Sequence, residues 1–253
     1  RSMAQQYFNQ SSVIFPGQGS QEQGMGRDVA EAYPQVMELW KKAEKATNAS
    51  LREIYWEGDE QAMTETSYQQ PALVVTSLGL WKILSSRLRP KYFAGHSIGE
   101  YTALIAAGAL DLDQALELVS LRGRLMSEAG RSNAGKMAAI LKLSQETVQE
   151  LVDQAREISG ETLLIANYNT PQQLVISGAE NAVDKAMELA KQQKGRPVSL
   201  PVSGAFHSAL MNEAAGELAG FMEKLHWKTP EVPVHLNVTA NAETNVDKLL
   251  ANM

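Results

Sequence analysis

Residues 93–100 read Phe93-Ala94-Gly95-His96-Ser97-Ile98-Gly99-Glu100, which indicates the end of a short strand, a Gly-x-Ser-x-Gly turn and the start of a helix. The two glycines tolerate close approach of the backbone and unusual backbone angles. Such a turn presents the serine hydroxyl at a helix N-terminus, where an acyl-transferring nucleophile is expected. Because the bare pattern arises by chance in about one chain of this length in ten, its meaning depends on the residues that accompany it.

Strands and helices alternate before and after this turn. The predicted elements up to the serine are a strand at 13–15, a helix at 27–45, a helix at 72–88 that begins at Pro71, and a strand at 91–95. This order is typical of a parallel sheet with helices on both faces. We therefore predict an α/β fold with a hydrolase-like large domain built on a parallel sheet.

The stretch from 133 to 203 follows a different order, β-α-β-β-α-β, which is that of a ferredoxin-like unit. Its predicted elements are strands at 136–141, 162–167, 173–177 and 196–202, helices at 144–156 and 182–193, and a turn at 169–171, with Ser144 as a helix cap. We expect residues 133–203 to be an inserted subdomain, and residues 4–132 and 204–253 to form the large catalytic domain. Beyond the insert, the pattern predicts a helix at 208–225, a strand at 232–238 and a helix over 246–253.

The composition limits the class of protein. A 44% hydrophobic fraction in 253 residues suits one large domain or two unequal ones. No apolar run approaches the roughly 20 residues of a membrane helix, and a net charge of −6 argues against nucleic-acid binding. The lack of cysteine excludes disulfides and thiolate chemistry, and it predicts a cytoplasmic setting. Arg1-Ser2-Met3 resembles a cloning remnant followed by a start methionine.

A serine nucleophile needs a base, and His207 is the leading candidate. Ser97 precedes the insert and His207 follows it, so both residues could face one cleft between the two domains. Of the other histidines, His96 adjoins the serine and is expected to point elsewhere, His226 lies at a predicted helix end, and His235 lies on the polar face of a predicted strand. A lone histidine is often structural, so the residues alone leave the role of His207 open.

Arg122 interrupts the apolar stripe of a helix predicted at 112–129. The stripe consists of residues 115, 118, 119, 122, 125 and 126. A guanidinium in an apolar surface needs an anion, either a structural carboxylate or the carboxylate of a ligand, and both alternatives stay open. Arg124 lies off the stripe and is expected to be solvated.

The loop Gly17-Gln18-Gly19-Ser20-Gln21 lacks the lysine of a P-loop and the spacing of a dinucleotide fingerprint. It is either a plain strand-to-helix turn or the source of a second oxyanion donor, the Gln18 amide, beside that of Ile98.

Five strings in this order resemble the malonyl-CoA:acyl-carrier-protein transacylase family, and the likeness covers the chain from about Val13 onward. They are Phe15-Pro16-Gly17-Gln18-Gly19-Ser20-Gln21, Gly95-His96-Ser97-Ile98-Gly99-Glu100-Tyr101, Arg122-Gly123, Asn167-Tyr168-Asn169-Thr170-Pro171 and Gly204-Ala205-Phe206-His207-Ser208. The resemblance implies a ping-pong transfer that serves fatty-acid biosynthesis, with polyketide synthesis as the open alternative. The serine takes malonyl from coenzyme A, and the phosphopantetheine thiol of acyl carrier protein then takes it from the serine.

The resemblance also implies roles for particular residues. They are Ser97 as nucleophile, His207 as general base and acid, Arg122 as the partner of the malonyl carboxylate, Gln18 and Ile98 as oxyanion amides, Asn167 as a residue near the active site, and Phe206 as the side chain that crowds an α-methyl branch. No cofactor, metal, nucleic acid or membrane is expected; malonyl-CoA and acyl carrier protein are the substrates.

Family chains continue for several dozen residues beyond the position of Met253, so we expect this sequence to be a truncated or incompletely recorded version; the alternative is a fragment that lacks part of its active-site wall. Two alternatives to transfer remain. An acyl-serine open to water would make the protein a thioesterase or esterase. A domain that only docks carrier proteins would need no chemistry at Ser97.

Overall fold

The computed structural model describes residues 11–202, 204–239 and 241–248. The chain divides into two compact units. The first comprises Arg1–Gly123 and Leu218–Met253, and the second is Arg124–Glu217. The residues predicted as the insert, 133–203, lie inside the second unit, and their exact bounds remain a prediction.

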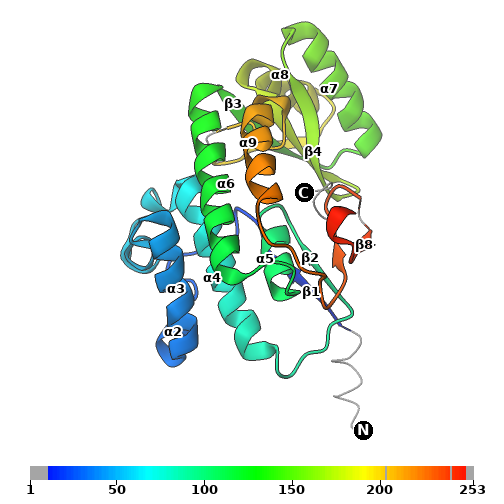
Figure 1. Cartoon of the computed structure of the whole chain (residues 1–253). Helices are drawn as coiled ribbons and strands as arrows, with labels where there is room; N and C mark the ends of the chain where they lie inside the picture. Colours follow the sequence, from blue (N-terminus) through cyan, green and yellow to red (C-terminus); the bar gives the residue numbers. More distant parts are fainter. Residues whose placement is uncertain (1–10, 203, 240, 249–253) are drawn as a thin grey trace. The chain divides into compact units, whose positions relative to one another are not determined.

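The first unit contains a four-stranded sheet and most of the helices (Figure 1). Its elements are β1 (Ser12–Phe15), α2 (Arg27–Ala32), α3 (Pro34–Thr47), η1 (Glu53–Glu57), η2 (Ala62–Thr64), α4 (Thr66–Leu84), β2 (Tyr92–Gly95), α5 (Gly99–Ala106), β7 (Val234–His235) and β8 (Ala242–Glu243). Two helices, α6 (Leu112–Ser132) and α9 (Asn212–Glu223), contribute residues to both units. The sheet order is β1-β2-β7-β8; β2 pairs in parallel with β1 and β7, and β8 is antiparallel to β7. The predicted α/β class with a parallel sheet is confirmed.

The core of this unit holds the strand that leads to the serine turn. Phe93 on β2 is 1% exposed. Its ring lies 5.9 Å from that of Phe15 and meets the Trp81 ring of α4 edge-on at 5.1 Å. Aromatic pairs at such separations add to the stabilisation from buried area. The serine turn therefore begins from a strand that is anchored in the core by the buried Phe93 ring.

The helix predicted at 27–45 is interrupted, so that prediction is wrong in one respect. The structure has two helices, α2 and α3, separated by Tyr33. Tyr33 is extended (φ −128°, ψ 110°) because it precedes Pro34, and proline disfavours helical angles in the residue before it. Pro34 then serves as the first residue of the next helix.

The prediction that a helix starts at Pro71 is also wrong. Helix α4 begins at Thr66, and Pro71 lies within it. The start is set by Glu65, whose carboxylate accepts hydrogen bonds from the N–H (3.3 Å) and hydroxyl (3.0 Å) of Ser67. As a result Gln70 lies on the helix and not in the loop before it.

The second unit follows the predicted β-α-β-β-α-β order. Its elements are β3 (Gly135–Leu141), α7 (Gln145–Ser159), β4 (Leu163–Thr170), β5 (Gln173–Ala179), α8 (Glu180–Gln192), β6 (Arg196–Ser199) and η3 (Ala209–Met211). The sheet order is β4-β5-β3-β6, and every neighbouring pair is antiparallel. The predicted cap is confirmed, because the Ser144 hydroxyl accepts a hydrogen bond from the Thr147 N–H at 3.2 Å.

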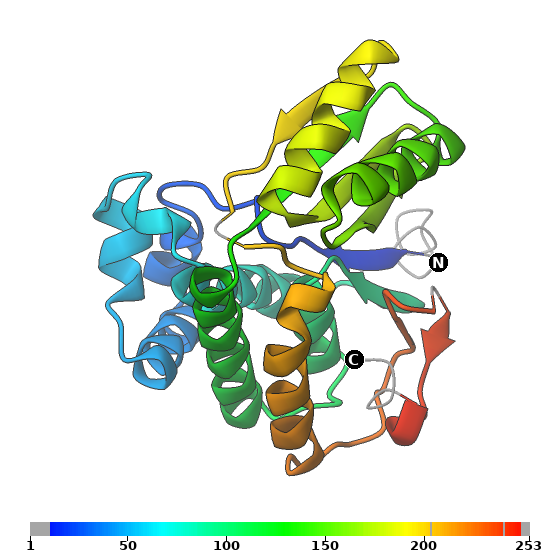
Figure 2. The same cartoon turned by 90° about the horizontal axis from the view of Figure 1, so that it is seen from above.

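The two faces of this second sheet bury different clusters. Helices α7 and α8 lie side by side on one face (Figure 2), over Ile140 and Ile176. Met137 and Val175, which alternate with those residues along the strands, pack instead with Phe206. The string that contains His207 is therefore anchored to the face opposite the helices.

Three predicted elements near the C-terminal end differ from the structure. The strand predicted at 196–202 ends at Ser199, and the one predicted at 232–238 contains only Val234 and His235. The last predicted helix is present as a helical turn at residues 246–248, and its remainder lies outside the described residues. Among the described residues, no helix has the length and apolarity needed to cross a membrane.

We predict that Phe93→Ala lowers the free energy of unfolding by about 3–5 kcal/mol, because it removes a buried ring between two aromatic neighbours. Chemical denaturation measures this change. Ile14→Ala on the paired strand is the control, since Ile14 is 72% exposed. An equal loss in both variants would contradict the packing described for this core.

Candidate active site

Two glycines determine the shape of the serine turn, residues 95–99. A Cβ on Gly95 would collide with the backbone of Gly99, and a Cβ on Gly99 would collide with the carbonyl of Phe15. Between them Ser97 takes a left-handed conformation, with φ 52°. This conformation costs a non-glycine residue about 1–3 kcal/mol and is typical of functional sites.

The turn leaves a backbone donor next to Ser97. Ile98 is 1% exposed and lies at the N-terminus of α5. The described part of the chain supplies no hydrogen-bond acceptor for its N–H. A helix N-terminus with an unpaired N–H beside a nucleophile is suited to stabilise an oxyanion.

The loop that contains Gln18 packs against this turn. A Cβ on Gly17 would collide with the carbonyl of His96, so the two backbones are in close contact. The Gln18 side chain donates a hydrogen bond to the Thr66 hydroxyl at 3.2 Å. The loop is thus fixed beside the serine turn, while the role of the Gln18 backbone amide remains a prediction.

Arg122 lies beside the nucleophile and is 8% exposed. Its Nη2 donates to Ser97 Oγ at 3.3 Å, and its Nη1 donates to Gln70 Oε1 at 2.9 Å. The guanidinium carbon lies 5.1 Å from the centre of the Tyr101 ring. No carboxylate among the described residues forms an ion pair with Arg122. The buried Glu100 carboxyl interacts with Arg122 through its charge but forms no ion pair with it, so no carboxylate among the described residues occupies the guanidinium donors.

Gln70 is a site residue that the sequence reasoning missed. It is 1% exposed and points its side-chain oxygen at Arg122. Its position on a helix was obscured by the wrong start assigned at Pro71. The sequence signal that could have revealed it is the position of Gln70 directly before the apolar run 71–75, where a polar side chain next to the core needs a partner.

A second missed group lies on the other side of Ser97. Asn237 Oδ1 accepts a hydrogen bond from the Ser97 N–H at 3.0 Å. Its Nδ2 donates to the Gly95 carbonyl (2.6 Å) and to Glu100 Oε2 (2.7 Å), and its N–H also donates to Glu100 Oε2 (2.6 Å). Burial raises the pKa of Glu100 above its usual value of 4.5, although the Asn237 hydrogen bonds and the charge of Arg122 oppose that shift.

In the second unit, His207 is exposed and has φ 60°. The turn around it is held by the Ser208 hydroxyl, which donates to the Ala205 carbonyl at 2.6 Å, and by the Ser177 hydroxyl, which donates to the Phe206 carbonyl at 2.7 Å. Only five non-glycine residues in the described ranges have positive φ, and the two predicted catalytic residues, Ser97 and His207, are among them.

Phe206 and Asn167 also belong to this unit. The Phe206 ring is 3% exposed and packs in the cluster with Met137 and Val175. Asn167 is half-buried on β4, at a register shift that follows Ile165. Bulges of this kind often redirect a side chain next to an active site. The roles given to both residues remain predictions.

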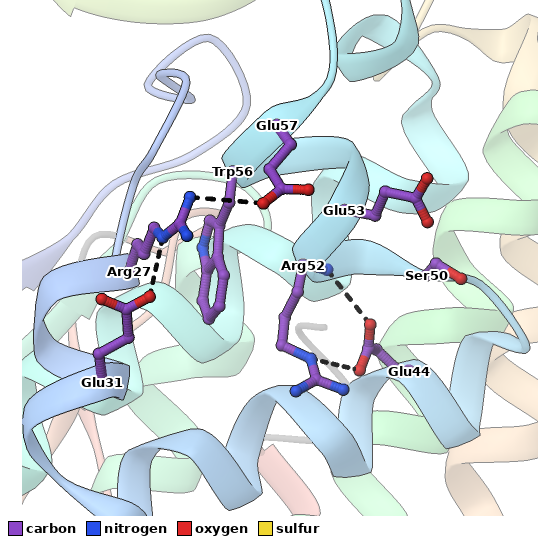
Figure 3. A pocket seen from close by; sticks show the side chains of 8 residues that line it. All are labelled: Arg27, Glu31, Glu44, Ser50, Arg52, Glu53, Trp56 and Glu57. Carbon is purple, nitrogen blue, oxygen red and sulfur yellow. Dashed lines mark hydrogen bonds and ion pairs between the residues drawn. The ribbon is translucent and has the colours of Figure 1, made fainter.

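A hollow of about 430 Å³ on the first unit contains two arginines, but it is a poor candidate for the phosphates of coenzyme A (Figure 3). Arg27 pairs with Glu31 at 2.9 Å and lies over the Trp56 ring, and Arg52 pairs with Glu44 at 2.7 Å. Its lining residues are Arg27, Glu31, Glu44, Ser50, Arg52, Glu53, Trp56 and Glu57. Four carboxylates outnumber two guanidiniums there. The described residues contain no cluster of three or more His, Cys, Asp or Glu suited to a metal ion.

The family model of the acyl transferase domain matches residues 13–251. The α/β fold with its serine turn is therefore that of an acyltransferase.

Comparison with individual relatives shows which kind of acyltransferase the chain resembles. A malonyl CoA-acyl carrier protein transacylase of Bacillus subtilis is 42% identical over 235 residues, which are 92% of this chain and 74% of the relative. The crystal structure of malonyl-CoA:acyl carrier protein transacylase from Xanthomonas oryzae has a TM-score of 0.90 at 36% identity, covering 96% of this chain and 78% of that one. A malonyl-transacylase in complex with a type II polyketide acyl-carrier protein also has a TM-score of 0.90, at 34% identity, covering 96% and 79%. The chain belongs to the malonyl-CoA:acyl-carrier-protein transacylase family.

The raised pKa of Glu100 predicts a particular dependence of stability on pH. The carboxyl of Glu100 ionises at a lower pH in the unfolded chain than in the folded chain. The contribution of Glu100 to the free energy of unfolding of the wild type therefore falls as the pH rises above 4.5. We predict that the unfolding free energy of Glu100→Gln minus that of the wild type rises with pH in the window above 4.5, by up to about 1.4 kcal/mol per unit.

Chemical denaturation at several pH values measures this difference. Glu60→Gln is the control, because Glu60 is an exposed carboxylate of the same unit. A difference that falls with pH, or one that matches the control, would contradict the assignment of Glu100 as a buried acid.

Proposed function

We propose that this chain transfers the malonyl group of malonyl-CoA to the phosphopantetheine thiol of acyl carrier protein, by a ping-pong reaction through a malonyl ester of Ser97. The observation that carries this proposal is the Arg122 guanidinium, whose Nη2 lies 3.3 Å from Ser97 Oγ on the same unit. The names of the relatives and the carrier-protein complex of one of them support it.

The arginine suits a malonyl group because of where malonyl carries its charge. A single methylene separates its carboxylate from the thioester carbonyl, so the carboxylate must lie within a few ångströms of the atom that Ser97 attacks. Arg122 forms no ion pair among the described residues; Glu100 interacts with it only through its charge, and the guanidinium hydrogen bonds go to the neutral groups of Gln70 and Ser97. A bidentate contact with malonyl gives the guanidinium a charged partner, which acetyl cannot supply.

In the first half of the reaction, His207 accepts the proton of the Ser97 hydroxyl while Oγ attacks the thioester carbonyl. The N–H groups of Ile98 and Gln18 stabilise the resulting oxyanion. The carbon–sulfur bond then breaks, and the sulfur of coenzyme A leaves with the proton from His207. The unpaired N–H of Ile98 and the left-handed conformations of Ser97 and His207 support these assignments.

The second half reverses these steps with a different thiol. The carrier's phosphopantetheine thiol gives its proton to His207 and attacks the malonyl ester. The ester bond breaks, and Ser97 Oγ recovers the proton. The proposed reaction uses only its two substrates and no cofactor, because the thioester of malonyl-CoA supplies the activated acyl group.

We also assign Asn167 and Phe206 to the substrate side of the site. For Asn167 the support is the bulge beside it, because bulges often redirect a side chain next to an active site. For Phe206 the support comes from its place next to His207, and its burial implies that it shapes the site by fixing the turn. The order β4-β5-β3-β6 supports a ferredoxin-like subdomain at 133–203 within a catalytic domain of 4–132 and 204–253. The cytoplasmic location remains a prediction from the sequence.

We predict that incubation with malonyl-CoA produces a malonyl adduct on Ser97, visible by intact-mass and peptide mass spectrometry. The adduct should persist in buffer and disappear when acyl carrier protein is added, with malonyl appearing on the carrier. Rapid release of free malonate without dependence on the carrier would instead establish a hydrolase.

The same experiment on Ser97→Ala separates catalysis from docking. This variant should bind the carrier as the wild type does and transfer nothing. Transfer by the variant would refute Ser97 as nucleophile, and a wild type that binds the carrier without transfer would make the chain a docking domain.

Arg122→Ala should lower kcat/KM for malonyl transfer by about 10²-fold or more, because it removes a charged hydrogen-bonded partner of the carboxylate. Transfer of acetyl from acetyl-CoA should change much less. Arg124→Ala is the matched control, since Arg124 is 61% exposed and is 4.0 Å from Glu128. Equal losses for both acyl groups would show that Arg122 is structural.

A further inference from the structure

We propose that Asn237 and Glu100 are positioning residues for acyl transfer: the Asn237 side-chain amide holds both flanks of the serine turn, and Glu100 holds that amide in the required orientation. Neither residue touches the reacting atoms in this account. The inference concerns the reaction of the proposed function and rests on it for its kinetic test.

The Asn237 side chain takes over the hydrogen bonds of the parallel sheet just beyond the point where the backbone pairing of β2 with β7 ends. The pairing of β2 with β7 ends at Ala94 and His235, and its register would place residue 237 opposite His96. In a parallel ladder, such a residue donates to the carbonyl before its partner and accepts from the N–H after it. The side-chain amide of Asn237 makes these two bonds, to the carbonyl of Gly95 and the N–H of Ser97.

Glu100 reinforces an amide orientation that the Gly95 carbonyl, an acceptor, and the Ser97 N–H, a donor, already require. Its Oε2 accepts from Asn237 Nδ2 at 2.7 Å and from the Asn237 N–H at 2.6 Å. A carboxylate accepts hydrogen bonds and cannot donate them, so it requires the amide nitrogen on its side. The amide oxygen is thereby left for the Ser97 N–H. Both Nδ2 hydrogens and the oxygen have partners, so the orientation is fully specified.

The consequence for the reaction follows from the strain at Ser97. A left-handed serine persists only when its surroundings impose that conformation. The Asn237 amide fixes the backbone on both sides of His96, and with it the direction of Ser97 Oγ and of the next N–H, that of Ile98. Asn237 is an exposed residue, so replacing it removes these bonds without opening a cavity in the core.

Asn237→Asp tests the pair most sharply, because it is isosteric and places an oxygen against the Gly95 carbonyl and the Glu100 carboxylate. We expect kcat for malonyl transfer to fall by about 10²-fold, the size of a lost oxyanion donor, with KM for malonyl-CoA changed by less than about threefold. Asn237→Ala should lose less, since it removes the bonds without adding repulsion. Asn241→Asp, the same change at an exposed position of the same segment, is the control.

A second readout does not depend on malonyl specificity. The rate at which a fluorophosphonate labels Ser97 should fall most in Asn237→Asp, less in Asn237→Ala and not in Asn241→Asp. The measurement is made at a temperature where circular dichroism shows every variant folded. If Asn237→Asp does not fold, Asn237→Ala carries the test, with an expected loss of at least about tenfold in both readouts.

Labelling and kcat within about twofold of Asn241→Asp would overturn the proposal, as would a rise in KM with kcat unchanged. If labelling falls as expected while the wild type transfers no malonyl, the Asn237–Glu100 pair stands and the proposed function fails.

Discussion

The left-handed conformation of Ser97 is the constraint on which the site depends. It exists because Gly95 and Gly99 allow the strand and the helix to approach at van der Waals contact, and because the buried Phe93 side chain anchors strand β2, from which the turn begins. Groups that are distant in sequence then meet this turn: the Gln18 loop packs on it, Asn237 bonds to both of its flanks, and Arg122 reaches Ser97 Oγ. The chemistry assigned to the chain follows from that convergence.

A single charge distinguishes this site from a general serine acyl site. Arg122 is almost fully buried, and its direct contacts among the described residues are a glutamine, a serine hydroxyl and an aromatic ring, while the Glu100 carboxyl interacts with it without forming an ion pair. Burying a guanidinium without an anion is costly, so the arrangement favours an acyl group that brings one. Membership of the malonyl transacylase family agrees with this reading of the local electrostatics.

Much of this was predictable from the sequence, for local reasons. The serine turn, the Ser144 cap and the alternating strands of the second unit are specified by neighbouring residues, and the structure contains them. The single helix predicted at 27–45 and the start predicted at Pro71 were wrong: Pro34 begins a second helix, whereas Pro71 lies inside α4, so a proline does not mark a unique helix boundary. Gln70 and Asn237 were missed since their partners lie 52 and 140 residues away, beyond what periodicity can report.

The most direct test of the central claim is a crystal structure of the chain trapped as its malonyl ester on Ser97. The account predicts that the malonyl carboxylate lies in hydrogen-bond contact with the Arg122 guanidinium, with the Gln70 contact retained and the ester oxygen directed at the Ile98 N–H. A carboxylate directed away from Arg122, with the guanidinium still held only by Gln70 and Ser97, would contradict it.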